Sequence, residues 1–314
     1  MYFLLFSHNV IVSGKEKSAI YDLQHARILY IPNVFVAILE ELKTNPIDLV
    51  KKTKFSNNSF LLDAYLKKLV DNRMGHFVNQ IEDFPELDFE YYFPGTIHSA
   101  LLETNLKNYN IFKVIDTLDL LGCRHVELRL NISIINIETL KNALSIWENN
   151  LLQSIDLYLE HEKSISKEII LELYRTFNKI NSIVIVNSPI DALLQEKQIC
   201  LQKCSLVVLD EKGLKNKKLI LDLRYYSESL KYNTNYNNKV RIDIEGNIKN
   251  TLFDQRIYGN VKSDVLLDII ESEEFQQFWR ITVDNIEELK DSPLRHAIFS
   301  PNAMEKREGK YYLI

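Results

Sequence analysis

The stretch "RHVELRLNISIINIETLKNALSIWENNLLQSIDLYLE", residues 124–160, has two short β-rich runs with a helical run between them. In residues 125–130 and 154–160, apolar and polar residues alternate, which is typical of strands with one buried face. Residues 136–150 have the length and apolar spacing of one helix. A strand, a connecting helix and a second strand predict a βαβ unit and a parallel sheet.

The same alternation continues on both sides of this unit. Residues 99–106 and 182–188 are β-rich, and residues 111–122 and 166–180 have helical spacing. Residues 205–211 and 218–226 are also β-rich and predict a final strand pair, with the basic segment 212–218 as a solvated loop between them. The middle of the chain, residues 85–230, is therefore predicted to be α/β, with a sheet that is open or partly closed into a barrel.

The flanking regions have different patterns. Two β-rich runs, 2–14 and 18–32, are broken at Gly14-Lys15, and three helical segments follow at 34–45, 47–52 and 58–74. This order is compatible with a winged-helix module over residues 1–84. Residues 231–314 contain a predicted hairpin at 239–250 and a helix at 263–279.

Composition narrows the class of protein. Of the 314 residues, 46% are hydrophobic and 26% charged, which is typical of an ordered globular chain of two or three domains. Acidic residues outnumber basic ones by 43 to 38, so the charge gives no general attraction for nucleic acid or anionic membranes. No run of apolar residues is long enough to span a membrane. The three cysteines fit a reducing compartment, and we expect a cytoplasmic protein.

Metal and nucleotide motifs are missing from the sequence. Cys200 and Cys204 are four residues apart and would share one helix face, but no third and fourth ligand lies nearby. We interpret these two residues and Cys123 as buried structural cysteines. None of the seven histidines has a recognised ligand spacing, and no phosphate-binding glycine pattern occurs. The sequence therefore predicts no metal site and no cofactor.

Polar residues occupy one face of the predicted central strands. Helices must cover the apolar face, so these side chains are expected on the concave side of the sheet. Buried charges are costly unless they are paired or hydrated, so the face is either an aqueous cleft or a structural ion-pair layer of Glu127, Arg129 and Asp156. Candidate general acids or bases are Glu127, Asp156 and Glu160, and the other cleft candidates are Glu103, Asn105, His125, Arg129 and Tyr158.

Residues 235–301 carry a resemblance to a known family. After Trp279, the segment "ITVDNIEELKDSPLRHAIFSP" follows the hairpin and helix. This arrangement resembles the SPASM domain of peptide-modifying radical SAM enzymes, and more narrowly the SPASM-domain peptide maturases of grasp-with-spasm systems. The positions that match the family pattern are Asp284, Ile286, Lys290, Asp291, Arg295 and Pro301. Weaker similarity extends to "MYFLLFS", "YIPN" and "LDLLGCRHVELR".

The resemblance implies a partial (β/α) barrel of radical SAM type, but the cluster ligands are missing. Where the family pattern has cysteines, this chain has Asn235, Thr251, Leu289, Ser292 and Ile298. Iron–sulfur clusters need thiolate ligands, and residues 205–314 contain no cysteine. The segment after the first barrel strand also lacks the Cys-x3-Cys-x2-Cys motif. Conventional radical SAM chemistry is therefore excluded by the residues present.

The resemblance also implies a role for the N-terminal region. In such systems, a winged-helix element captures the leader of a precursor peptide as an added strand. Strand addition gains affinity from backbone hydrogen bonds and specificity from side-chain pockets. The residues that would provide the edge and a hydrophobic wall are Arg27, Leu29, Tyr30, Ile31, Phe35 and Leu39.

The leading hypothesis is a cluster-free, non-catalytic relative that binds a ribosomally made precursor peptide, as a partner of an ATP-grasp ligase. A second hypothesis is an iron-independent peptide-modifying enzyme that uses the cleft carboxylates. A third is a structural subunit of a complex, with the helix "ESEEFQQFW" as the docking surface, unless Phe275, Phe278 and Trp279 lie in the core.

Overall fold

The computed structural model describes residues 1–55, 59–80, 86–130, 137–162, 166–194, 198–215 and 218–314. Its centre is one nine-stranded sheet. From edge to edge the strands are β10 (Ala192–Leu194), β11 (Ile199–Leu201), β9 (Ile180–Val186), β8 (Ser154–Glu160), β7 (His125–Leu130), β6 (Ser99–Thr104), β13 (Lys239–Ile242), β14 (Asn247–Lys249) and β15 (Gly259–Asn260). Neighbouring strands from β11 to β13 in this order are parallel, and the outer strands are antiparallel. The predicted α/β class with a mostly parallel sheet is confirmed.

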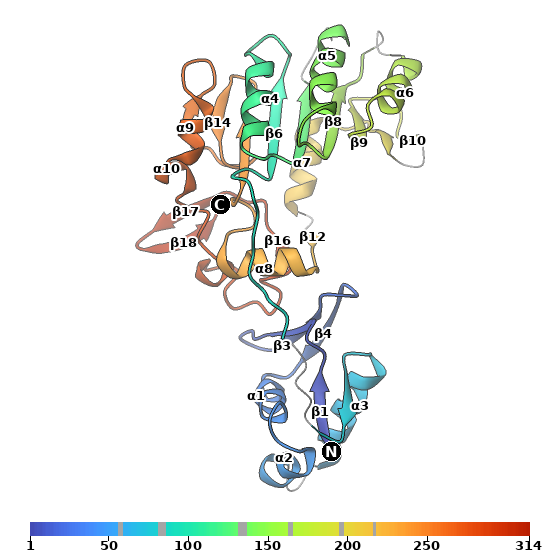
Figure 1. The fold of residues 1–314 in the computed structure, drawn as a ribbon, viewed down its shortest axis with the longest axis vertical. Coiled ribbons are helices and arrows are strands. Elements are labelled where there is room, and N and C mark those ends of the chain that lie inside the picture. Colours follow the sequence, from blue (N-terminus) through green and yellow to red (C-terminus); the bar gives the residue numbers. More distant parts are fainter. Residues whose placement is uncertain (56–58, 81–85, 131–136, 163–165, 195–197, 216–217) are drawn as a thin grey trace.

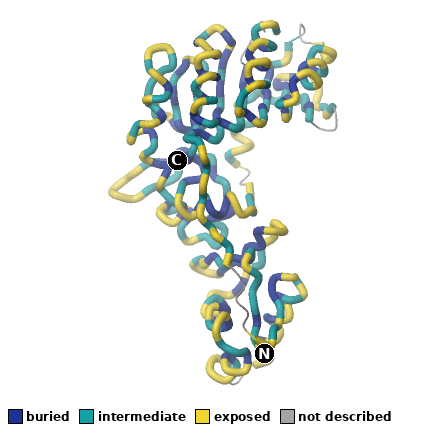
Figure 2. Tube along the Cα trace, viewed as in Figure 1, coloured by how far each residue is buried: buried dark blue, intermediate teal, exposed yellow. Residues whose placement is uncertain are grey.

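Three helices cover one face of this sheet: α4 (Ile111–Leu120), α5 (Ile137–Glu148) and α6 (Lys167–Thr176) (Figure 1). Their apolar residues pack against Val126, Leu128, Ile155 and Leu157 of β7 and β8. The strands are largely buried and the outer helix surfaces exposed (Figure 2). The alternation that predicted the strands therefore also determines which face the helices cover.

The predicted final strand pair is wrong. Residues 206–215 form helix α7 (Leu206–Lys215), and residues 223–231 form helix α8 (Leu223–Lys231). Between them, among the described residues, β12 (Lys218–Leu219) is the one short strand. The Asp222 carboxylate accepts the Tyr225 amide at 2.8 Å, and the Ser205 hydroxyl accepts the Val208 amide at 3.4 Å. These N-terminal caps start helices in segments whose apolar composition favoured strands.

The N-terminal region contains the predicted ribbon and three helices. Strands β2 (Asn9–Val12), β3 (Ser18–Asp22) and β4 (Arg27–Ile31) form an antiparallel sheet, and β1 (Tyr2–Leu5) pairs with the unpredicted β5 (Gly75–Val78). The helices are α1 (Asn33–Leu42), α2 (Ile47–Lys54) and α3 (Ser59–Asp71). Their apolar faces form a separate hydrophobic cluster with Phe3, Ile20 and Ile31.

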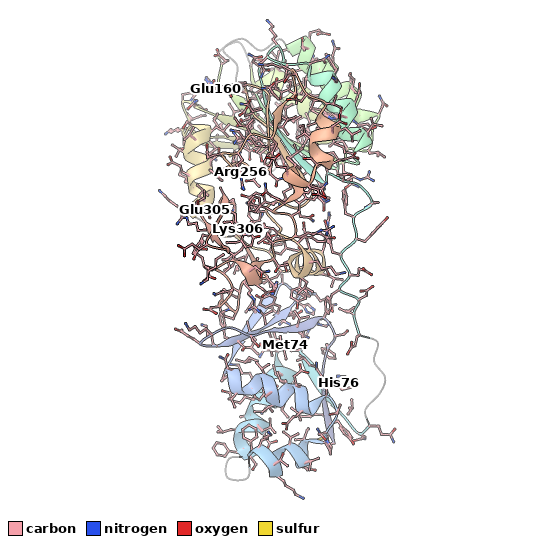
Figure 3. All side chains as sticks on the ribbon, turned by 90° about the vertical axis from the view of Figure 1, so that its left-hand side faces the viewer. Met74, His76, Glu160, Arg256, Glu305 and Lys306 are labelled. Carbon is pink, nitrogen blue, oxygen red and sulfur yellow. The ribbon has the colours of Figure 1, made fainter. Side chains whose placement is uncertain are left out.

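The sheet β2-β3-β4 is packed on both of its faces. Ile20 faces the N-terminal helices, whereas Val10 and Tyr21 pack against Tyr226 of α8 and Ala297. Every residue of β3 is buried as a result. Figure 1 shows α8 and the C-terminal strands between this sheet and the central sheet. Figure 3 likewise places Arg256, Glu305 and Lys306 between Glu160 at one end of the molecule and Met74 and His76 toward the other.

The C-terminal region continues the central core. The predicted hairpin is confirmed as β13 and β14, which extend the central sheet through β6. The predicted helix 263–279 is instead two short helices, α9 (Leu266–Glu271) and α10 (Glu273–Gln276), because the Ser272 hydroxyl caps a new start by accepting the Phe275 amide at 3.2 Å. Phe275, Phe278 and Trp279 are buried in the main cluster, which runs from Ile97 to Met304.

The remaining described elements are a 3-10 turn at Val283–Asn285, β16 (Ile298–Phe299), which pairs with β12, and the hairpin of β17 (Met304–Arg307) and β18 (Lys310–Leu313). In the parts of the chain that are described, no helix combines the length and apolarity needed to cross a bilayer.

Candidate functional site

A ladder of charged side chains lies on the sheet face opposite α4, α5 and α6. Arg129 is at its centre, with a side chain that is only 6% exposed. Its guanidinium donates to both Asp210 carboxylate oxygens at 2.8 and 2.9 Å, and to Glu127 at 2.5 Å. Glu103 lies 3.8 Å from Arg129 and accepts a 2.7 Å hydrogen bond from Arg241 of β13. The network joins β13, β6 and β7 to helix α7.

The electrostatics of this ladder are those of a mutually satisfied ion-pair layer. Burial raises the pKa of Glu127, although Arg129 opposes the shift. Burial would lower the pKa of Arg129, but hydrogen bonds and charges from Asp210 and Glu127 raise it overall. Tyr158 lies over the guanidinium at 5.6 Å, and burial raises its pKa to about 12. The structure thus brings Glu103, Glu127, Arg129 and Tyr158 together, with Asp210 as a partner that the sequence did not indicate.

Other predicted cleft residues lie outside the ladder. Among the described residues, Asp156 forms no ion pair with Arg129; its carboxylate accepts hydrogen bonds from Ser182 at 2.5 Å and Asn181 at 2.8 Å. His125, at the start of β7, contacts the Ser154 hydroxyl at 2.7 Å. Glu160, at the end of β8, lines an apolar cavity of about 240 Å³ between α6 and β10, with Lys167 and Ile170. The candidate carboxylates therefore occupy separate environments.

Asn105 is not a residue of the predicted strand. Strand β6 ends at Thr104, and the exposed Asn105 closes a turn in which its side-chain oxygen accepts the amides of Lys107 and Asn108 at 2.9 and 2.7 Å. The hydroxyl of Thr104 also donates to Asn108 at 2.7 Å. Such local side-chain hydrogen bonds compete with strand pairing, so Asn105 belongs to an exposed turn and not to the strand.

A polar cavity at the opposite end of the strands was not predicted. Its volume is about 240 Å³, and its lining includes Lys239 at the start of β13, Glu228 of α8, His98, Arg224 and Tyr91. The Lys239 ammonium donates to the Thr234 carbonyl, and Glu228 accepts from Asn237 at 2.9 Å. Burial lowers the pKa of Lys239 and raises that of Glu228, each opposed by the charge of the other. These residues come from distant segments, so no local motif could have revealed them.

The positions that the resemblance assigns to cluster cysteines are filled by packed side chains. Leu289 is 3% exposed and belongs to the main core. Asn235 donates to the Asn302 carbonyl at 3.1 Å, and Ile298 pairs with Leu219 in a β-bridge. Asn235, Leu289 and Ile298 line one cavity of about 10 Å³. That volume is roughly the space for one water, so neither the donors nor the space fit an iron–sulfur cluster.

The segment around Ser292 holds the N-terminal sheet instead. The Tyr21 hydroxyl donates to the Pro293 carbonyl at 2.6 Å. The Lys15 amide donates to the Asp291 carbonyl at 2.9 Å, and Arg295 donates to the Ser13 carbonyl at 2.5 Å. The turn after Leu289 therefore binds the β2–β3 hairpin.

The predicted peptide-binding residues divide into two groups. Ile31, Phe35 and Leu39 are 2–4% exposed and form the N-terminal core, so they provide no exposed hydrophobic wall. Leu29 packs partly against the same core. Tyr30 is 43% exposed, with the Lys17 ammonium 3.8 Å from its ring, and Arg27 is bound to Asp22. Strand β4 pairs with β3 on one edge and with no other described strand.

The cysteines do not form the predicted pair on a helix. Cys200 lies in strand β11, which pairs antiparallel with β10, and Cys204 follows it before α7. Both are free and partly buried. Cys123 is buried as expected, and burial raises its pKa to about 12.

The similarity of this chain to known proteins is weak. No family model matches the chain, and no curated protein matches it. Among solved structures, the chain is similar to the crystal structure of Streptococcus suis SuiB bound to S-adenosylmethionine, at 11% identity, with 94% of each chain covered and a TM-score of 0.31.

Proposed function

We propose that this chain is a cluster-free relative of the SPASM-domain peptide maturases that binds a ribosomally made precursor peptide through residues 1–84. The observation that carries the proposal is the outer edge of β4, which pairs with β3 on its other edge and with no other described strand. An extended peptide can add to such an edge through backbone hydrogen bonds. Tyr30 offers an exposed aromatic contact beside it, with Lys17 against its ring.

The residues at the former cysteine positions support the cluster-free part of the proposal. Asn235, Leu289 and Ile298 line one small cavity. Such a convergence is expected if the equivalent positions in a relative held one iron–sulfur cluster. The chain keeps this arrangement while it uses the turn at Pro293 to hold the β2–β3 hairpin. In the proposed function, the central region is related to a partial barrel and supports the N-terminal peptide-binding region. It does not generate radicals.

A test of peptide binding uses the purified full-length chain and a fluorescently labelled copy of the short peptide encoded beside its gene. We expect saturable binding by fluorescence anisotropy, weakened by Tyr30→Ala by about tenfold because an aromatic contact is lost. Tyr92→Ala is the matched control, since Tyr92 is 82% exposed and lies outside β4. Absence of binding, or equal weakening by both variants, would contradict the proposal.

The resemblance extends the proposal to a partner. An ATP-grasp ligase would receive the bound peptide, and a gene for such a ligase beside this one is the expected observation. Co-purification of the ligase with this chain, dependent on the peptide, would support the partnership. A neighbourhood without ligase and precursor genes would remove it, while leaving the anisotropy result as a separate test of peptide binding.

A further inference from the structure

Three residues with metal-ligating side chains meet at one end of the N-terminal sheet. His8 precedes β2, Asp22 ends β3, and His25 lies in the turn between β3 and β4. One ligand atom from each lies within 4.8 Å of the others. The β2–β3 register pairs Asn9 with Asp22, which brings His8 beside the carboxylate. The sequence spacing alone gives no recognised metal motif.

The distances fit a single small ion. His8 Nε2 lies 3.7 Å from Asp22 Oδ1, and His25 Nδ1 lies 3.0 Å from the same oxygen. In a tetrahedral site with bonds of about 2.0 to 2.1 Å, ligand atoms are roughly 3.3 Å apart. The two distances bracket that value, and one ligand atom from each of the three residues lies within 4.8 Å of the others.

His8 supplies a second observation. Its Nε2 atom is shielded from solvent and has no hydrogen-bond partner among the residues that the structure describes. Buried nitrogen atoms without a partner are uncommon and costly in folded proteins. The ring is held against Phe6, with centroids 5.7 Å apart, so its orientation is constrained. A bound metal ion would give this nitrogen a partner.

The surroundings of Asp22 orient its carboxylate. The side chain is fully buried, and Arg27 Nε donates to Oδ2 at 3.1 Å. The His25 amide donates to Oδ1 at 3.0 Å, and His25 Nδ1 lies 3.0 Å from both carboxylate oxygens. Hydrogen bonds of this kind commonly fix ligating carboxylates. Because Arg27 offsets the carboxylate charge, the ion would depend on the two imidazoles, which favours zinc-like ions over Mg²⁺ and Ca²⁺.

The site is open on one side. A surface cavity of about 480 Å³ is lined by His8, His25, Phe6 and Gln24. Three protein ligands with one position facing such a cavity are typical of sites that hold an exchangeable water. We propose that His8, Asp22 and His25 bind one divalent transition-metal ion of the zinc class, which ties the β3–β4 turn to the segment before β2. This proposal does not depend on peptide binding.

The test uses tag-free full-length protein titrated with Co²⁺, followed by visible absorption, and then Zn²⁺ in competition. We expect one ion per chain, displacement by Zn²⁺, and no displacement by Mg²⁺. His25→Gln should weaken binding by at least about tenfold, because one ligand is lost. The His25 side chain is 46% exposed, so this variant should remain folded, as circular dichroism would verify.

His8→Gln should have the same effect, and His161→Gln is the matched control because His161 is exposed and outside the cluster. The proposal is overturned if the wild-type chain binds less than one ion at saturation. It is equally overturned if His25→Gln and His8→Gln bind Co²⁺ as tightly as the wild type, or if His161→Gln weakens binding as much as they do.

Discussion

Arg129 on strand β7 and Asp210 on helix α7 form a two-pronged ion pair, with donor–acceptor distances of 2.8 and 2.9 Å. The pair attaches α7 to the polar face of the central sheet. Bidentate arginine–carboxylate pairs combine strong hydrogen bonds with a fixed geometry. The ladder of charged side chains on this face therefore has a structural partner in α7. The interpretation of the face as an ion-pair layer accounts for Glu103, Glu127 and Arg129 together.

The first prediction concerns this pair. Arg129→Met should lower the free energy of unfolding by about 3 kcal/mol, because Glu127 and Asp210 would remain without their buried cation. Urea denaturation of the purified protein measures the change. Lys141→Met removes a solvent-exposed pair with Glu172 at 2.7 Å and should lower the free energy of unfolding far less than Arg129→Met does. Similar losses in both variants would show that the ladder is no more important than a surface pair.

Sequence reasoning succeeded where periodicity was long and flanked by turns. The alternation in residues 125–130 and 154–160 correctly predicted two neighbouring parallel strands. It failed at residues 205–226, where apolar residues dominate and only Ser205 and Asp222 indicate helix starts. Partners such as Asp210 and Lys239 could not be predicted, because contacts between distant segments depend on how the elements pack.

For the candidate sites, too, the sequence predicted which residues share a face but not which distant residues they contact. Alternation predicted that Glu127 and Arg129 share a face, but not that Asp156 would instead bind Ser182. The helical spacing of Phe35 and Leu39 correctly predicted that they lie on one face of α1. That face is buried in the N-terminal core, so these residues leave no exposed hydrophobic wall. His8, Asp22 and His25 come together only through strand pairing, so their proximity was invisible in the sequence.

The second prediction addresses the contact between the N-terminal sheet and the C-terminal turn. Tyr21→Phe removes the hydroxyl that donates to the Pro293 carbonyl at 2.6 Å, in a side chain that is fully buried. The free energy of unfolding should fall by about 1 to 2 kcal/mol, because the carbonyl loses its donor. Tyr92→Phe, at an exposed position, should leave the urea midpoint unchanged. Equal midpoints for all three proteins would refute the importance of this contact.

The third prediction concerns a position that the resemblance assigns to a cysteine. Leu289→Ala should cost about 3 kcal/mol, because a buried leucine leaves a cavity in the main core. Leu219→Ala, at a side chain that is 50% exposed, should cost less than about 1 kcal/mol. Chemical denaturation compares the two. If Leu289→Ala lowers the free energy of unfolding no more than Leu219→Ala does, the Leu289 side chain does not contribute to the main core and the prediction is wrong.

The fourth prediction is a pH dependence that arises from His296. Burial lowers the pKa of this histidine to about 4, although Asp284 opposes the shift, and its ring contacts the Ser229 hydroxyl at 3.0 Å. The unfolded chain takes up a proton near the ordinary histidine pKa of about 6.5, whereas the folded chain does so only near pH 4. The stability that the neutral His296 ring contributes is therefore fully present above about pH 6.5. It is lost progressively as the pH falls toward 4.

His296→Gln should remove this contribution, so the loss of unfolding free energy between pH 7 and pH 4.5 should be smaller than in the wild type by about 2 kcal/mol. Urea denaturation at several pH values gives both curves, and their difference measures the contribution of His296 together with its contact to Asp284. His161→Gln, at an exposed position, should follow the wild-type curve. Parallel curves for wild type and His296→Gln would mean that His296 accepts a proton as readily in the folded chain as in the unfolded one.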